Sequence, residues 1–387
     1  MSSRKTRVLI ECPELIASAR VGVVDFLNEI ATEIVESRFV RTIDIKKDDI
    51  RWADIYVTVR GCESLSYQLA KYAKNNGRRI IYYLDDDLLH VPEDSTAYEF
   101  YSCKDTIKYM NKIMGISEYL WGVNDLIKQH YLREGQTWIE NKIPCIVEKT
   151  DRKVRDPEQI NIVYAGSVSH QKLVDEILQP AIAEIIRRYD GKFRFTFIGP
   201  KLKLDSKYIE NVELMDDYDE YVQYMKNRTF EYGLAVVKSD SFYWHKYYNK
   251  YLEYARWGIV GLYTDSMPYS AVIKNGQNGI LVENEKWQNA IENLIVSDCY
   301  QRMKKQIEMD IHSNFSKMKI QKEFLGNYGK VFTFEARRNI RGIFPSKKLL
   351  WVMSRVPLYW HLFGLKTFYI APYKMIKKIT RKRKRDA

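Results

Sequence analysis

Short apolar runs alternate with longer amphipathic stretches along most of the chain, which is typical of a parallel sheet joined by crossover helices. In the first part, apolar runs predict strands at residues 7–10, 54–59, 79–84 and 119–123. Stretches with helical periodicity predict helices at residues 21–35, 64–75, 106–114 and 125–132. A polar stretch without periodicity at residues 148–158 then predicts a linker.

The same alternation restarts after the linker. Apolar runs predict strands at residues 161–164, 193–198, 232–237, 260–263 and 279–282. Periodic stretches predict helices at residues 173–189, 218–226, 249–257, 286–293, 298–311 and 315–336. We therefore expect an α/β protein with two doubly wound domains, residues 1–150 and 151–335. Ligands of such sheets bind outside the carboxyl ends of the strands, so polar residues that follow strands are the candidates for a site between the domains.

The most informative stretch runs from residue 240 to residue 283, and its predicted helix begins near Asn249. Lys250 lies in the first turn, and Glu253 lies three residues later on the same face. A helix N-terminus suits a diphosphate, because its N–H groups lack intrahelical partners and its dipole end is positive, and a lysine adds charge for phosphate. A carboxylate one turn further along accepts both hydroxyls of a ribose. The alternative is an ordinary Lys–Glu pair on a helix surface.

This stretch resembles the C-terminal domain of retaining GT-B glycosyltransferases of the large family-4 type. The matching residues are Lys250, Glu253, Tyr254, Ala255, Gly258, Thr264, Asp265, Tyr269, Gly276, Asn278, Gly279, Leu281 and Val282. The resemblance implies the GT-B fold, in which two Rossmann-like domains face each other across a cleft. It also implies that Glu253 binds the ribose of a nucleotide-sugar donor. Many members carry a second glutamate eight residues earlier, where this chain has His245. His245 either replaces that glutamate, as a hydrogen-bond donor to a sugar hydroxyl or a phosphate, or has no role.

Two glycine turns follow the first strands of the second domain. Gly166 follows the strand at residues 161–164, and the resemblance places this loop at the donor phosphates, with Ser167, His170 and Lys172 as the polar candidates. Gly199 follows the next strand, and the resemblance places it beside the nucleotide base. Strand-to-helix turns also contain glycine for packing reasons alone, so this alternative stays open.

In the first domain, the strand at residues 79–84 ends in three carboxylates at residues 85–87. Asp86 and Asp87 are candidate catalytic residues that hydrogen-bond a sugar or acceptor hydroxyl; the alternative is a solvated turn or helix cap. Arg20 and Gly22 resemble the entrance of the same family and are candidates for the acceptor side. Aspartates also suit Mg²⁺, but the resemblance implies an enzyme without an essential metal, so we expect no metal site and no cofactor.

The net charge of +12 belongs to the end of the chain. Residues 335–387 contain 15 basic and 2 acidic residues, which leaves the rest of the chain at −1. This argues against nucleic-acid binding by the chain as a whole. Residues 336–387 interleave aromatic and basic side chains, which favours association with an anionic membrane surface; a solubilising tail and a nucleic-acid contact are the alternatives. No apolar run is long enough to predict a transmembrane helix.

The resemblance implies a retaining glycosyltransferase that moves a sugar from a nucleotide-sugar, with UDP as the expected nucleotide, to a glycan or lipid-linked acceptor in bacterial cell-surface polysaccharide synthesis. We expect a cytoplasmic enzyme on the inner face of the plasma membrane. The five cysteines are widely spaced, which argues against a disulfide framework and against a zinc site with paired cysteines. A GT-B epimerase or phosphorylase, or a non-catalytic partner subunit at the membrane, are the alternatives.

Overall fold

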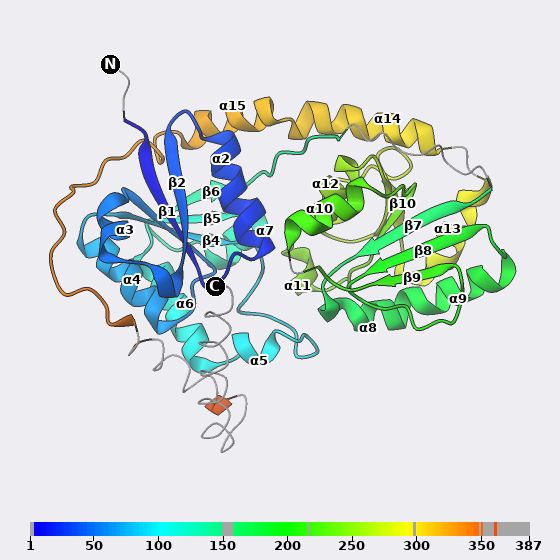
Figure 1. The fold of residues 1–387 in the computed structure, drawn as a ribbon, viewed down its shortest axis with the longest axis horizontal. Helices are drawn as coiled ribbons and strands as arrows, with labels where there is room; N and C mark the ends of the chain where they lie inside the picture. The colour runs from blue at the N-terminus through cyan, green and yellow to red at the C-terminus, as the bar shows by residue number, and fades with distance from the viewer. Residues whose placement is uncertain are drawn as a thin grey trace, which may run out of the picture. The chain divides into compact units, whose positions relative to one another are not determined.

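Two parallel β-sheets, each of six strands, organise the protein, and each sheet lies in its own unit (Figure 1). The computed structural model describes residues 4–148, 158–215, 217–296, 299–347, 350 and 360–361. The first unit joins the described parts of residues 1–141 and 323–387, and the second contains those of residues 142–322.

In the first unit the strand order is β2-β1-β3-β4-β5-β6. The strands are β1 (Thr6–Cys12), β2 (Val35–Arg41), β3 (Ile55–Val59), β4 (Arg79–Leu84), β5 (Tyr119–Gly122) and β6 (Thr137–Glu140). The helices are α1 (Ala17–Ala19), the π-helix η1 (Arg20–Asp25), α2 (Phe26–Ile30), the 3-10 helix η2 (Thr42–Asp44), α3 (Lys47–Trp52), α4 (Ser64–Asn75), α5 (Tyr98–Tyr101), α6 (Lys104–Ile116) and α7 (Asp125–Tyr131). Figure 1 shows α3, α4 and α6 on one side of this sheet and α2 on the other. Every residue of β3 is therefore buried.

In the second unit the strand order is β12-β11-β10-β7-β8-β9. The strands are β7 (Ile160–Ala165), β8 (Phe193–Ile198), β9 (Ile209–Val212), β10 (Tyr232–Ala235), β11 (Val260–Thr264) and β12 (Ile280–Val282). The helices are η3 (Val168–His170), α8 (Gln171–Leu173), η4 (Val174–Leu178), α9 (Gln179–Arg188), α10 (Tyr218–Lys226), α11 (Ser241–Trp244), α12 (Asn249–Arg256), η5 (Tyr269–Ala271), η6 (Asn284–Lys286), α13 (Trp287–Val296), α14 (Tyr300–Asp310), η7 (Ile311–Phe315) and α15 (Lys317–Tyr328), the last of which continues into the first unit.

Both sheets are doubly wound, because the chain starts near the middle of each sheet and builds outward in two directions. The direction reverses between β1 and β3 in the first sheet and between β7 and β10 in the second. A crevice opens outside the carboxyl ends of the strands at such a reversal, and this is where open α/β sheets bind ligands. The fold class expected from the sequence is confirmed.

The sequence predictions missed three strands and short helices such as α3, and they placed two helix ends wrongly. The strands β2, β6 and β9 were not predicted. The helix predicted over residues 21–35 is wrong in its last part, because α2 ends at Ile30 and the chain enters β2 at Val35. The helix predicted over residues 315–336 is also too long, since α15 ends at Tyr328 and the chain then turns to pack Phe332 against the rings of Trp121 and Phe324.

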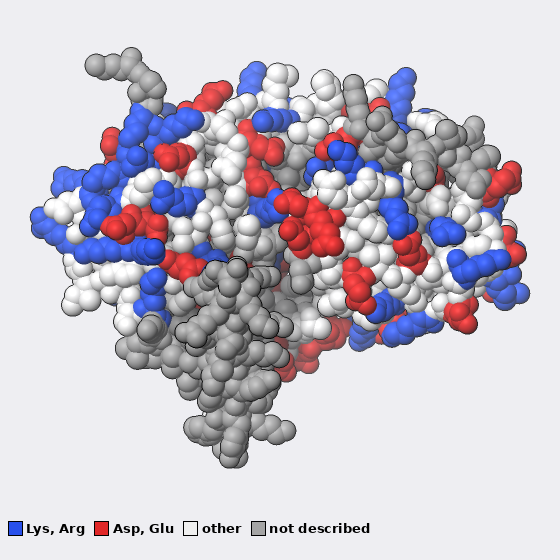
Figure 2. All heavy atoms as spheres, in the orientation of Figure 1, with Lys and Arg blue, Asp and Glu red and all other residues white. Residues whose placement is uncertain are grey.

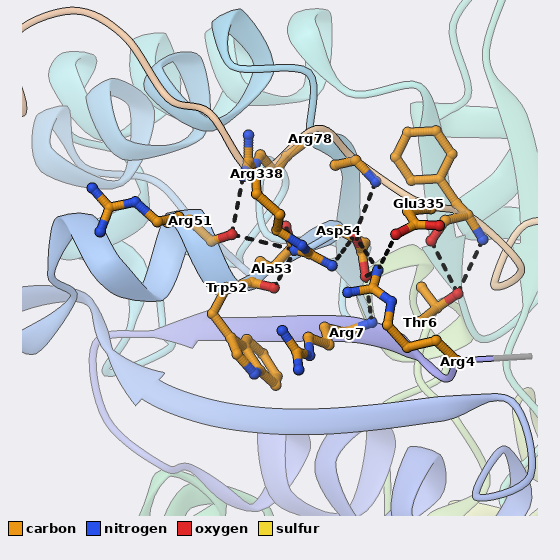
Figure 3. Close-up of polar contacts among 12 residues, drawn as sticks. Arg4, Thr6, Arg7, Arg51, Trp52, Ala53, Asp54, Arg78, Glu335 and Arg338 are labelled. Carbon is orange, nitrogen blue, oxygen red and sulfur yellow. Dashed lines mark hydrogen bonds and ion pairs between the residues drawn. The ribbon is translucent and has the colours of Figure 1, made fainter.

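Residues after α15 close the first unit around Asp54, which lies just before β3 (Figure 3). The Asp54 side chain is fully buried. It accepts hydrogen bonds from the guanidinium groups of Arg4 (2.8 Å) and Arg338 (2.8 Å) and from the backbone N–H groups of Arg7 (2.9 Å) and Ala336 (2.9 Å). One carboxylate therefore joins the start of the chain, the first strand and the segment beyond α15.

This segment continues along the first unit as far as the structure follows it. The backbone N–H of Arg341 donates to the Asn76 side chain (2.6 Å), and the Lys347 ammonium group donates to the carbonyl oxygen of Ile43 (3.0 Å). We expected a separate tail from residue 336, whereas the described residues up to 347 belong to the first unit, because their polar groups bond to it. Most of residues 348–387 lie outside the described part of the chain.

Candidate functional site

The centre of the second sheet brings two loops together at the reversal point. One segment follows β7 and carries His170 at the end of η3, and the other follows β10 and carries Tyr243 in α11. Their rings lie 6.3 Å apart between centroids, and the His170 ring also contacts the Tyr164 hydroxyl (Nδ1 to Oη, 3.2 Å). His170 thus lies at the reversal point of the second sheet.

The two predicted glycine turns lie side by side in this unit. The backbone N–H of Gly166 donates to the carbonyl of Ile198 (3.0 Å), and a Cβ atom on Gly199 would lie 2.1 Å from the carbonyl oxygen of Gly166. Gly199 also has a φ of +95°, which disfavours other residues. Close backbone approach between the loops therefore requires glycine at residue 199.

Gln171 fixes the spacing of these two loops, and the sequence analysis did not identify it. Its amide group donates to the carbonyl of Lys201 (2.8 Å), and its side-chain oxygen accepts from the backbone N–H of Lys201 (2.8 Å). Both hydrogen bonds go to a residue thirty positions away. The pattern of residues around Gln171 therefore gives no sign of them.

Lys250 and Glu253 project from the same face of the start of α12, as their spacing predicted. The Lys250 ammonium group lies 2.7 Å from Oε2 of Glu253. The hydroxyl of Tyr221, on α10, donates to the other carboxylate oxygen. Burial, and then the negative charge of Glu253, raise the pKa of Tyr221 well above its ordinary value, so the hydroxyl stays protonated and remains a donor.

Both charged side chains of this pair keep some exposure, 24% for Lys250 and 18% for Glu253. A tyrosine, Tyr248, stands at the N-cap of α12 where helices usually place a short side chain that accepts from the first N–H groups. The start of α12 therefore combines a cation, a carboxylate and backbone donors in one turn.

Three further predicted residues, His245, Ser167 and Lys172, contact neighbours a few positions away in sequence. His245, the C-cap of α11, is buried, and its Nδ1 bonds to the carbonyl of Ser241, the first residue of that helix. Ser167 accepts from the backbone N–H of Ser169 (3.3 Å), as a cap for η3. Lys172 is half exposed and lies 3.8 Å from Glu176 one helical turn later.

Arg60 dominates the corresponding edge of the first sheet, and the sequence analysis did not identify it. It follows β3 with a φ of +52°, in the left-handed region that favours glycine. Its guanidinium group bonds to Asp85 (2.6 Å), Asp86 (2.6 Å) and the Ser18 hydroxyl (3.0 Å). Burial alone lowers the pKa of Arg60, but the two aspartates outweigh it and hold the pKa well above its ordinary value. The loops after β1, β3 and β4 are thereby tied together at the reversal point.

The structure separates the two predicted catalytic aspartates. Asp86 pairs with Arg60, whereas Asp87 is buried, accepts from the Tyr131 hydroxyl and lies 2.8 Å from Nδ1 of His90. A sugar hydroxyl would have to displace Tyr131 or His90 to reach Asp87.

The two predicted acceptor-side residues also differ from each other. Arg20 keeps partial exposure and lies 3.6 Å from Asp25 within η1. Gly22 is buried, and a Cβ atom there would lie 2.1 Å from the hydroxyl of Tyr83. Gly22 is therefore required by packing against Tyr83.

Comparison with known proteins supports the fold. The sequence matches no protein-family model and no curated protein. Among solved structures, Anabaena HepE in complex with UDP and glucose matches with a TM-score of 0.58, covering 84% of this chain and 100% of its own, at 10% identity. Sucrose-phosphate synthase from Thermosynechococcus elongatus matches with a TM-score of 0.58 over 85% and 99%, at 10% identity. The lipopolysaccharide outer core galactosyltransferase WaaB, in its apo form, matches with a TM-score of 0.52 over 84% and 99%, at 14% identity.

The chain has the GT-B fold. The expectation drawn from residues 240–283 is thus confirmed at the level of fold, for both units of the chain. Within the described residues, no helix is long and apolar enough to span a bilayer.

Proposed function

We propose that the protein is a glycosyltransferase that moves a sugar from a nucleotide-sugar donor, a UDP-sugar, to a glycan or lipid-linked acceptor in cell-surface polysaccharide synthesis, with retention at the anomeric carbon. The observation that carries this proposal is the carboxylate of Glu253, held between Lys250 and Tyr221 at the start of α12. The solved structures that share the fold include one with UDP and glucose and one described as a galactosyltransferase.

In this proposal the second unit binds the donor. Glu253 accepts the ribose hydroxyls, and Lys250 with the N–H groups of α12 and the Gly166 loop binds the diphosphate, to which His170 and Lys172 contribute. Departure of the nucleoside diphosphate concentrates negative charge on its oxygens. Preorganised cations and N–H groups stabilise that charge more in the transition state than in the ground state, which accelerates the reaction.

The first unit binds the acceptor in this proposal. Asp86, fixed by Arg60, accepts a hydrogen bond from an acceptor hydroxyl, and Arg20 contacts a phosphate. No essential metal is required, because the charge on the leaving group is neutralised by side chains and N–H groups. Transfer should therefore not depend on added Mg²⁺ or Mn²⁺, and a strict requirement for either ion would contradict this part.

The test is hydrolysis and transfer of a panel of UDP-sugars by the wild-type protein and by Glu253→Ala. Loss of a charged hydrogen-bonding partner costs about 1.5–3 kcal/mol, so kcat/KM for the donor should fall roughly 10- to 100-fold. Glu308→Ala is the matched control, since it removes an exposed glutamate from α14 in the same unit. An active wild type with an indistinguishable Glu253→Ala variant would refute the assigned role.

A non-catalytic partner subunit is the second candidate, and one observation favours it. His245 stands where many related enzymes have a glutamate, and it is buried with one ring nitrogen bonded to the backbone. If the wild type binds UDP but neither hydrolyses nor transfers any donor of the panel, the chain is such a subunit.

We further propose that the enzyme works at the inner face of the plasma membrane and is held there by its basic C-terminal segment. The described part of this segment reaches Ile43 near β2 and α3, and Figure 2 shows lysine and arginine side chains gathered over that part of the first unit. Each basic residue near an anionic surface contributes about 1 kcal/mol.

The vesicle test uses a deletion that respects the Asp54 contacts. Removing residues 348–387 leaves Ala336 and Arg338 in place, whereas removal from residue 336 would take both from Asp54. The full chain should sediment with phosphatidylglycerol vesicles but not with phosphatidylcholine vesicles, and the deletion variant with neither. Equal sedimentation of both proteins with anionic vesicles would contradict the membrane proposal without affecting the Glu253 assay.

A further inference from the structure

Two histidines and a buried aspartate converge in the first unit, apart from the residues assigned to the donor and the acceptor. Asp87 and His90 belong to the turn that follows β4, and His130 lies in the last turn of α7. Nδ1 of His90 lies 2.8 Å from one oxygen of Asp87, and Nδ1 of His130 lies 3.6 Å from the other. One ligand atom from each of the three side chains lies within 4.8 Å of the others.

We propose that Asp87, His90 and His130 bind a zinc ion. Zinc takes imidazole nitrogen and carboxylate oxygen at about 2.0–2.2 Å, so two tetrahedral ligands lie about 3.3 Å apart. The separations of 2.8 and 3.6 Å involve different oxygens of Asp87, and the three ligand atoms, one from each side chain, lie within 4.8 Å of one another. They must therefore draw closer to reach about 3.3 Å. The two histidine side chains are 61% and 44% exposed, so they have room for the small rotations that the remaining adjustment needs.

The surroundings of Asp87 match those of a metal-binding carboxylate. The Tyr131 hydroxyl donates to one oxygen of Asp87 and also accepts from the backbone N–H of Leu89 (3.0 Å), so the carboxylate is held in one orientation. Partners that orient a ligand in this way contribute substantially to metal affinity. The backbone turn is closed by a hydrogen bond from the N–H of His90 to the carbonyl of Asp87 (3.2 Å), which places both side chains on the same side.

The ligand set distinguishes zinc from the harder cations. Mg²⁺ and Ca²⁺ prefer oxygen ligands, whereas two imidazoles with one carboxylate suit zinc and neighbouring transition metals. Three protein ligands leave a fourth position, which water can fill. The ion would fix the turn after β4, which carries Asp85 and Asp86, to α7.

The test measures metal content, so it does not depend on transferase activity. The full chain is stripped with EDTA, incubated with Zn²⁺, separated from unbound metal and analysed by atomic emission. We expect one zinc ion per chain in the wild type and at least a tenfold loss of affinity in His90→Ala and in His130→Ala, with a higher melting temperature in Zn²⁺ for the wild type alone. His312→Ala, which removes an exposed histidine of the second unit, should bind zinc as the wild type does.

Co²⁺ provides a second readout, because its visible absorption reports nitrogen and oxygen ligands directly. The wild type should show this absorption, and neither His90→Ala nor His130→Ala should. Both histidines are exposed, so their replacement should leave the chain folded. A wild type without bound zinc, or variants at residues 90 and 130 that bind it equally well, would overturn the proposal.

Discussion

The charged clusters at the carboxyl edges of the two sheets are built in opposite ways. In the second unit the cation and the carboxylate, Lys250 and Glu253, come from one turn of one helix. In the first unit Arg60 reaches Asp85 and Asp86 from a different strand end, 25 and 26 residues away in sequence. Helix geometry alone therefore brings Lys250 and Glu253 together. The Arg60 cluster, in contrast, exists only once β3 and β4 have paired.

We infer from this difference that the Glu253 pair serves ligand binding and the Arg60 cluster serves stability. A pair within one helical turn can exchange partners at little cost to the fold, which suits a site where a ligand replaces Lys250 on Glu253. The Arg60 cluster joins three strand-end loops, so its charges contribute to holding the first unit together. We expect changes in the Arg60 cluster to affect stability most, and changes around Glu253 to affect donor binding most.

The largest effect should come from Arg60→Ala, which leaves two carboxylates close together without their cation. Removing one partner of a largely buried ion pair costs about 3 kcal/mol or more, so the midpoint of urea denaturation should fall clearly. Arg60→Lys, the control, keeps the positive charge but loses the forked guanidinium group that contacts both aspartates. Its midpoint of urea denaturation should lie between those of the wild type and Arg60→Ala. If Arg60→Ala unfolds at the same urea concentration as the wild type but binds UDP less well, the Arg60 cluster acts in donor binding and not in stability.

A smaller effect is expected from Tyr221→Phe, which removes one hydrogen bond to Glu253 and nothing else. The KM for the donor should rise about five- to tenfold with kcat little changed, because the carboxylate is less well oriented. Tyr224→Phe, on the same helix, is the matched control, since its hydroxyl faces Glu210. Tighter donor binding in Tyr221→Phe would mean that the tyrosine competes with the ribose.

The smallest expected effect is on the pH dependence of stability, and it comes from a difference between the first strands of the two sheets. β1 contains the fully buried Glu11, whereas β7 contains no acidic residue. Burial raises the pKa of Glu11 above its ordinary value, and this exceeds the opposite effect of hydroxyl donors such as Thr58 and Ser66. The folded state therefore holds this proton to a higher pH than the unfolded state does, so Glu11 lowers stability as the pH rises above the ordinary glutamate range.

Glu11→Gln should accordingly match the wild type in urea denaturation at acidic pH and become slightly more stable than it at neutral pH. The measurement is a pair of urea titrations at the two pH values, with Glu36→Gln on the more exposed edge strand β2 as the control. An equal difference at both pH values would show that the charge of Glu11 is not the cause.

The sequence predicted the interior strands of both sheets and one edge strand, β12, but not the other three edges. The missed strands β2, β6 and β9 are all edge strands. An edge strand has one neighbour and an exposed side, so it needs few apolar residues, as the polar β9 shows. Periodicity detects burial, and these strands are only partly buried.

The candidate site follows a similar rule. Glu253 was predictable because its partner Lys250 lies three residues away, and helical periodicity relates the two positions. Tyr221 lies 32 residues from Glu253, and Arg60 lies at a strand end whose partners come from the next strand. Such pairings depend on the tertiary fold, which residue spacing does not encode.

The contacts of Asp54 determine the order in which the chain can fold as it leaves the ribosome. The first unit needs Ala336 and Arg338 to satisfy this buried carboxylate, so its native contacts are complete only after nearly the whole chain has been made. The second unit is continuous in sequence and can fold earlier. During synthesis the first unit therefore completes the contacts of this buried carboxylate only after the whole second unit has been translated.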